Sequence, residues 1–246
     1  MTALVPTAAF ADYEKYPPEE AFDYYIQYML LGIGIFLVIA GALFAYWRHL
    51  VEKDSRKAGK KKRSGRVIAD TNVNEKEIFQ GVLAIIGIGL LLRIIVAFPS
   101  PGYANDLGCW RSWSQTAADH FLDMYNVDSI IDYPPGYVYI LAFCGFIKNL
   151  FGVESLVMQN FIVRIPAIVA DCFIGYFIYK LLKGRTTKNW TYFFVAFWIF
   201  NPLAIIDSTV WGQVDSVLTL ALVIALYLIM KEKYVLSAVA FGVGVM

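Results

Sequence analysis

The sequence has few charged residues for its length. Charged side chains make up 17% of the 246 residues and hydrophobic ones 59%, whereas soluble domains have about 25% and about 45–50%. The mean hydropathy is +0.56. This composition predicts an all-α integral membrane protein, a multi-pass bundle of transmembrane helices in the cell membrane.

Motifs that bind nucleotides or metals are also scarce. The three cysteines (Cys109, Cys144 and Cys172) are scattered and odd in number, which predicts neither a disulfide framework nor a zinc cluster. There is no glycine-rich phosphate loop, no HExxH and no cysteine pair with metal-ligand spacing, so no nucleotide cofactor is expected. A net charge of +1 gives no global basis for binding nucleic acid. No secretory signal peptide is evident, because the first residues lack a basic region.

Apolar runs of about the twenty residues needed to cross the hydrocarbon alternate with charged connections. The first run is followed by a basic stretch, residues 48–66, which the positive-inside rule assigns to the cytoplasm, where it can also touch anionic lipid. The expected crossings are 24–47, 78–98, 161–182, 190–206 and 214–230, and residues 235–246 are expected to start a further, outward crossing. Residues 136–151 are short for a span, and we favour a membrane-embedded or re-entrant helix on the outer side. A short spanning helix is the alternative.

Much of the polar chemistry lies in residues 103–139, between apolar runs. Apolar side chains including Trp110 and Trp113 recur at three- and four-residue spacing, which predicts an amphipathic helix over 107–121 at the membrane interface of the first extracytoplasmic loop. Asp106 directly precedes it. That carboxylate can cap the helix or act as a general base, and the two roles are compatible.

Two further segments combine acidic and aromatic residues. A double proline, expected to begin a helix and to fix its neighbours rigidly, is flanked by Asp132, Tyr133 and Tyr137. The second segment joins two apolar runs and contains Asp207, Trp211, Gln213 and Asp215. With the expected crossings, both segments and Asp106 collect on the outer face.

Arg93 and Arg164 lie near the expected outer ends of helices. A pair of guanidinium groups there is suited to binding a lipid phosphate, although snorkelling to the interface is an alternative. Asp171, about two helical turns from Arg164, is a candidate partner between helices rather than a catalyst.

Residues 78–246 resemble the GT-C superfamily of membrane glycosyltransferases, most nearly the protein-mannosyltransferase-like branch (family 39 and relatives). The resemblance rests on Arg93, on Asp106 followed by Trp113, and on residues 132–139, 164–171 and 201–216. It implies a polyprenyl-phosphate-linked, mannose-like sugar donor, an active site outside the cytoplasm in the cell envelope, and inversion at the anomeric carbon. The acceptor would be a lipid, a glycan or a protein. Some relatives bind a divalent metal and others need none, so the metal stays open.

By this resemblance Asp106 matches the catalytic carboxylate, Arg93 and Arg164 would hold the departing phosphate, and aromatic and amide side chains from both loops would line the sugar pocket. Residues 76–246 would be the N-terminal part of the glycosyltransferase module. Because the family continues for several more helices, we expect the chain to be part of a longer protein. Residues 1–75, a transmembrane helix with its basic linker, precede the resemblance and would be an added anchor or a partner-docking element.

Two alternatives come from other classes. A transporter or flippase of lipid-linked sugars would use the same charges for binding only, but it predicts related halves with broken helices, and no such repeat is evident. A non-catalytic membrane subunit would not need acidic patches that converge on one face.

Overall fold

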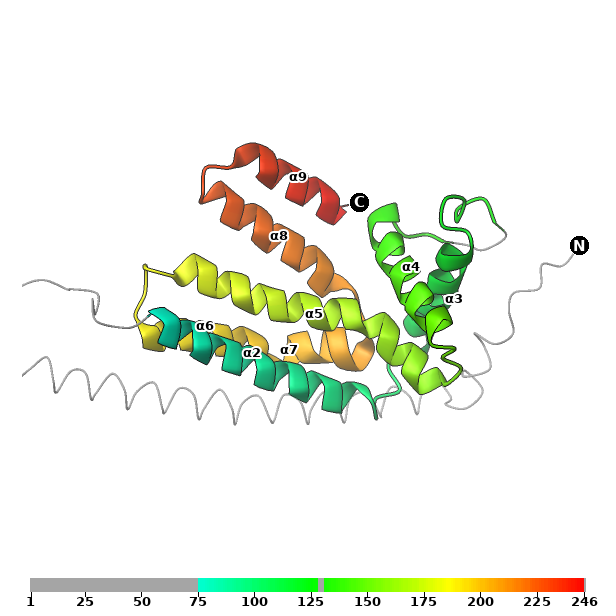
Figure 1. Cartoon of the computed structure of the whole chain (residues 1–246), viewed down its shortest axis with the longest axis horizontal. Helices are drawn as coiled ribbons and strands as arrows, with labels where there is room; N and C mark the ends of the chain where they lie inside the picture. The colour runs from blue at the N-terminus through cyan, green and yellow to red at the C-terminus, as the bar shows by residue number, and fades with distance from the viewer. Residues whose placement is uncertain (1–74, 128–130, 246) are drawn as a thin grey trace, which may run out of the picture.

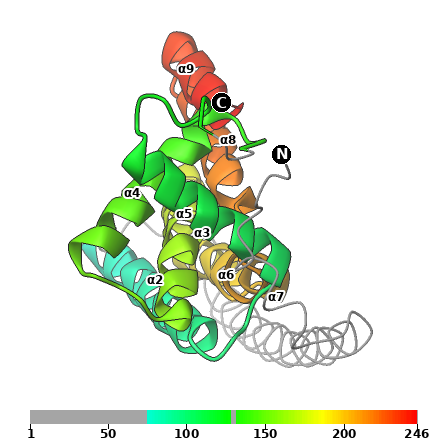
Figure 2. The same ribbon diagram turned by 90° about the vertical axis from the view of Figure 1, so that its right-hand side faces the viewer.

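The computed structural model describes residues 75–127 and 131–245, and every regular element in this part of the chain is a helix (Figures 1 and 2). This confirms the predicted all-α class for those residues. The expected crossing at 24–47 and the basic stretch 48–66 lie outside the described residues.

Three apolar helical runs are long enough to span a membrane, as expected of a membrane protein: α2 (Glu75–Ala97), α5 (Leu156–Leu182) and the run Lys188–Trp211. The last of these begins with α6 (Lys188–Ile199). At about 1.5 Å per residue, a helix of the length of α2 covers about 35 Å, more than the about 30 Å of hydrocarbon in a bilayer. The three runs lie side by side, with α5 antiparallel to the other two (Figure 1).

One end of this bundle is closed by two ion pairs. Glu75 lies 2.9 Å from Lys183, and Glu77 pairs with Lys188. Both pairs are exposed, so water and salt screen them and they contribute little stability. They join the start of α2 to the connection between α5 and α6. The opposite end therefore holds the end of α2 and the start of α5.

The run that begins with α6 is broken before it ends, unlike the expected helix 190–206. Asn201 accepts a hydrogen bond from the backbone N–H of Leu203 at 3.0 Å and so caps a short helix, α7 (Pro202–Ile205). This helix continues as a π-helix, η1 (Ile206–Trp211), which ends at Gly212 with φ of 95°. Such a left-handed conformation favours glycine, which has no Cβ.

The amphipathic segment forms α3 (Ala104–Asp119), which packs against α4 (Pro135–Leu150) at the end of the bundle where α2 ends and α5 begins (Figure 2). The double proline starts α4, as predicted. The capping role of Asp106 is wrong, because α3 begins two residues earlier and Asp106 lies within its first turn. The 16 residues of α4 extend about 24 Å, less than a bilayer core. Whether α4 spans the membrane or re-enters it stays a prediction.

Close approach of α3 and α4 depends on one small residue. A Cβ added at Gly145 would overlap the backbone carbonyl oxygen of Ser114 and the Cβ of Ala118. The neighbouring Cys144 is buried and donates its thiol to the carbonyl oxygen of Ile162 in α5 at 3.5 Å. In α5 the residue four positions later is Pro166, which has no N–H to donate to that carbonyl. Cys144 thus supplies a donor that the helix itself lacks.

The chain then turns into a second hairpin, α8 (Asp215–Ile229) and α9 (Tyr234–Val245), close to the expected 214–230 and 235–246. α8 packs on α5, and α9 lies along α8 (Figure 1). The buried hydroxyl of Ser237 donates to the carbonyl oxygen of Ala225 at 2.8 Å across this hairpin.

Candidate active site

The carboxylate of Asp106 is held by two side chains from the distant 201–215 segment. Trp211 donates its indole N–H to Asp106 Oδ2 at 2.9 Å. The side-chain amide of Gln213 donates to the same oxygen. Asp106 itself is half-buried. One carboxylate oxygen is therefore oriented by two donors, and the carboxylate keeps part of its surface accessible.

Backbone contacts fix the turn that carries these two donors. The carbonyl oxygen of Asp207 accepts the backbone N–H groups of Gly212 at 3.0 Å and of Gln213 at 2.9 Å. From the other side of the site, the indole N–H of Trp110 donates to the Gly212 carbonyl oxygen at 3.0 Å. The end of η1 is thus bonded both to itself and to α3.

Tyr103, directly before α3, makes a further link to Trp211. Its backbone N–H donates to the Trp211 carbonyl oxygen at 3.0 Å, and the two rings lie 4.9 Å apart between centroids. The Trp211 side chain is exposed and that of Tyr103 is half-buried. The two rings therefore form an aromatic surface beside the Asp106 carboxylate. Tyr103 was missing from the sequence-based site, because only the fold places it against Trp211.

The other acidic residues gather around Tyr133. Burial is the largest cause of the raised pKa of the Tyr133 phenol, and the negative charges of Asp215, Asp106 and Asp132 raise it further. Asp132 and Asp215 are exposed. Asp207 is half-buried in η1, close enough to Asp215 to interact electrostatically. Acidic residues from the three segments thus lie near Tyr133, and burial together with their charges raises the pKa of its phenol; their place on the outer face stays a prediction.

Three of the predicted pocket aromatics form core rather than surface. The side chains of Trp110, Trp113 and Tyr137 are buried. Trp110 makes edge-to-face contacts with Trp113 at 5.2 Å and with Tyr133 at 4.9 Å between ring centroids. This cluster packs α3 against α4. Tyr133, in contrast, is partly accessible. A direct contact with a sugar therefore fits Tyr133 but not the three buried rings.

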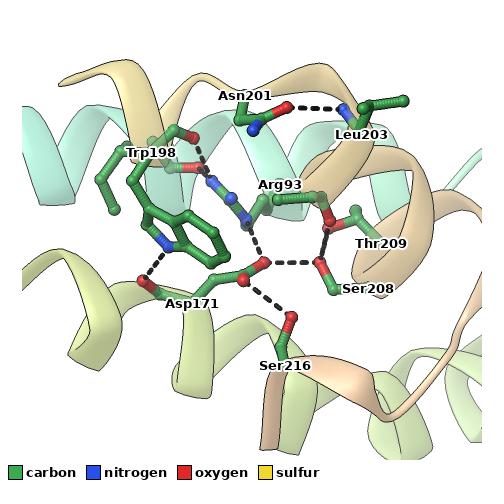
Figure 3. A network of polar contacts seen from close by, with 11 residues as sticks. Arg93, Asp171, Trp198, Asn201, Leu203, Ser208, Thr209 and Ser216 are labelled. Atoms are coloured by element: carbon green, nitrogen blue, oxygen red, sulfur yellow. Dashed lines mark hydrogen bonds and ion pairs between the residues drawn. The ribbon is translucent and has the colours of Figure 1, made fainter. Parts of the chain in front are cut away.

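Arg93 is fully buried in an ion pair (Figure 3). Its Nε donates to Asp171 Oδ2 at 3.1 Å, and its Nη1 donates to the carbonyl oxygen of Ile199 at 2.7 Å. Asp171 also accepts the hydroxyl groups of Ser208 at 2.6 Å and Ser216 at 2.8 Å. The prediction that Asp171 is a partner between helices is confirmed.

Arg164 is also buried, and it holds the connection between α2 and α3. Its Nη1 donates to the carbonyl oxygens of Ala97 at 2.8 Å and Ser100 at 3.1 Å. Two glycines with positive φ lie beside this guanidinium group: a Cβ at Gly102 would collide with it, and a Cβ at Gly212 would collide with Leu107 and lie 3.3 Å from Arg164 Nε. Neither Arg93 nor Arg164 presents its guanidinium group at the surface, so the predicted contact with a lipid phosphate does not fit this arrangement.

Within the described ranges, no group of three or more His, Cys, Asp or Glu side chains is placed to hold a metal ion. The sequence-based site also missed Ser208 and Ser216, the hydroxyl partners of Asp171. Their signal was weak, since serines near helix ends are common and usually face water. Their proximity to an acidic residue deep in a membrane helix became visible only in the fold.

Comparison with known proteins gives one distant similarity. No protein family profile and no solved structure matches the chain. Over 78 residues the chain is 28% identical to GPI mannosyltransferase 1 of Kluyveromyces lactis. The match covers 32% of this chain and 19% of that protein, so the chain spans about a fifth of its length. This supports a distant relationship to glycosyltransferases.

Proposed function

We propose that this protein is a membrane glycosyltransferase that moves a mannose-like sugar from a polyprenyl-phosphate donor to an acceptor hydroxyl, with Asp106 as the general base. The observation that carries the proposal is the Asp106 carboxylate, accessible on α3 and oriented by donors from Trp211 and Gln213. The distant similarity to a mannosyltransferase supports the reaction class.

The reaction is a single displacement. Asp106 takes the proton from the acceptor hydroxyl, whose oxygen forms a new bond to the anomeric carbon. The bond from that carbon to the phosphate oxygen breaks, and the polyprenyl phosphate leaves with the electron pair, which inverts the anomeric centre. Because Oδ2 is engaged by Trp211 and Gln213, Oδ1 is the oxygen that receives the proton. General-base assistance contributes about 10²–10⁴-fold in rate.

The surroundings of Asp106 suit a sugar. The rings of Tyr103 and Trp211 offer an aromatic surface, and the exposed carboxylates of Asp132 and Asp215 accept hydrogen bonds from sugar hydroxyl groups. Tyr133, held in its protonated form, is a hydrogen-bond donor between them. This proposal assigns Arg93 and Arg164 to the scaffold, not to the departing phosphate. Sidedness is part of the proposal: this end of the bundle faces the outside, and the end with Lys183 and Lys188 faces the cytoplasm.

Transfer of label out of the lipid donor tests the proposal. The full-length protein in liposomes is incubated with radiolabelled polyprenyl-phosphate mannose and acceptor membranes, and label in the aqueous and acceptor fractions is measured over time. Asp106→Asn should lower turnover about 10²–10⁴-fold while the protein stays folded. The matched control is Asp119→Asn, on the same helix, which is exposed and accepts a hydrogen bond from Gln115; this variant should keep wild-type turnover.

If Asp106→Asn turns over within a factor of about three of wild type, Asp106 is not the general base. A wild-type protein that binds the labelled lipid, or moves it across the bilayer, without releasing the sugar would instead be the transporter.

A further inference from the structure

Asp171 binds the segment that carries Trp211 and Gln213, the two donors to Asp106, at a residue before it and a residue after it (Figure 3). Its Oδ2 accepts the hydroxyl of Ser208 at 2.6 Å, three residues before Trp211 in η1. Its Oδ1 accepts the hydroxyl of Ser216 at 2.8 Å, three residues after Gln213 at the start of α8. The two carboxylate oxygens of one buried side chain therefore bracket the turn between η1 and α8.

Arg93 fixes the orientation of that carboxylate. Its Nε bonds Oδ2 of Asp171, and its Nη1 bonds the carbonyl oxygen of Ile199 at the end of α6. Both charged side chains are fully buried. Asp171 thus accepts Arg93 at 3.1 Å, Ser208 at 2.6 Å and Ser216 at 2.8 Å, and these directional, charge-assisted bonds hold the carboxylate and the two serines in place.

The element held in this way needs external support. π-helices are rare and mostly occur as single turns, frequently at functional sites. η1 contains six residues, and besides its own backbone bonds it is tied to α5 by the Ser208 hydroxyl. Its last residue, Trp211, donates to Asp106. A shift in the register of η1 is therefore passed directly to the carboxylate.

We propose that the buried Arg93–Asp171 pair is a positioning device for the active site: through Ser208 and Ser216 it sets where Trp211 and Gln213 hold Asp106. The inference rests on the proposed function of Asp106, but its structural part stands separately. All four side chains are buried, so in this proposal none of them contacts substrate. They act through the turn, and a misplacement of about 1 Å at a reacting group can cost about 10²-fold in rate.

The test removes each hydroxyl alone. Ser208→Ala and Ser216→Ala each delete one bond to Asp171 and leave the ion pair in place. The matched control is Ser237→Ala, which deletes a buried hydroxyl bonded to Ala225 in the α8–α9 hairpin, away from the site. Position is measured by ¹⁹F NMR of protein labelled with 5-fluorotryptophan. The chain has 6 tryptophans, and the Trp211 resonance is assigned by its loss in Trp211→Phe.

Both site variants should shift or broaden the Trp211 resonance and lower kcat about 10–100-fold, with KM for the lipid donor nearly unchanged. The Trp190 resonance, from α6 at the far end, should not move. Ser237→Ala should leave the Trp211 resonance and kcat at wild-type values.

An unchanged Trp211 resonance in folded Ser208→Ala and Ser216→Ala would overturn the proposal, as would a kcat loss equally large in Ser237→Ala. If only one site variant folds, that variant decides. If neither folds, the serines are purely structural and the proposal is also overturned. Should Asp106→Asn remain fully active, the proposed function fails while the NMR result still decides the positioning of Trp211.

Discussion

The buried ion pair predicts a strong and measurable coupling between two residues that are 78 positions apart in the chain. In Asp171→Leu the guanidinium group of Arg93 keeps its burial but loses its charged partner. Breaking a buried pair on one side costs about 3–5 kcal/mol of unfolding free energy, because an uncompensated charge remains. Arg93→Met leaves the carboxylate buried with only two hydroxyl donors, so a loss of similar size is expected.

The double variant should be more stable than either single one. Replacing both charges of a buried pair by apolar side chains is often neutral or stabilising. Without Asp171, the single O–H of Ser208 can donate to the carbonyl oxygen of Ala204, which lies 2.8 Å away, whereas Ser216 loses the partner described for it. One unsatisfied buried hydroxyl costs about 1–3 kcal/mol. We therefore expect the double variant to lose about 1–3 kcal/mol in total.

Unfolding in mixed micelles, followed by tryptophan fluorescence as the fraction of denaturing detergent rises, gives the four free energies of the cycle. The control cycle uses Glu75→Leu and Lys183→Met, an exposed pair at the other end of the bundle that should show no measurable coupling. If the losses of Asp171→Leu and Arg93→Met simply add in the double variant to within about 0.5 kcal/mol, the two residues do not act as a pair and the reasoning is wrong.

Two further predictions concern packing and charge. Gly145→Ala should cost about 1–3 kcal/mol of unfolding free energy, because the added Cβ would overlap the Ser114 carbonyl oxygen. In the control Gly87→Ala the added Cβ meets no atom within 4 Å, so this variant should not be destabilised. Equal stability of the two variants would contradict the contact at Gly145. Burial is the largest cause of the raised pKa of the Cys109 thiol, and the negative charges of Asp106 and Asp132 raise it further. Less thiolate is therefore present at a given pH. Alkylation of Cys109, followed by mass spectrometry, should be slow near neutral pH and faster as the pH rises. Asp132→Asn should lower the pKa of Cys109 and speed its alkylation, whereas Asp119→Asn should leave the rate unchanged. An unchanged rate in Asp132→Asn would show that Asp132 does not lie close to Cys109.

The positions of the helices could be read from local patterns. The apolar run at 78–98 is the helix Glu75–Ala97, and the double proline marks the first turn of α4. The reason is that hydrocarbon thickness sets a minimum length of apolar sequence, and proline is over-represented in the first turn of a helix. Both are properties of neighbouring residues.

The break after α6 was less visible. Asn201 and Pro202 mark a new helix start, but nothing in their neighbourhood distinguishes a π-helix from an ordinary one over Ile206–Trp211. The register of that turn is set by contacts with α5 and α3, which lie far away in the chain.

Which side chains pair with one another follows from the tertiary structure. The sequence alone was enough to predict the membrane class, the approximate helix boundaries and the segments in which acidic and aromatic residues lie together. It did not determine that Arg93 pairs with Asp171 in the core instead of facing a phosphate, or that Asp106 is held by Gln213, 107 positions away. Hydropathy fixes which stretch lies in the bilayer, but the rotation of each helix about its axis follows from packing against the others. That packing buries both arginines, leaves the Trp211 ring exposed and the Tyr103 ring half-buried, and brings the acidic residues together.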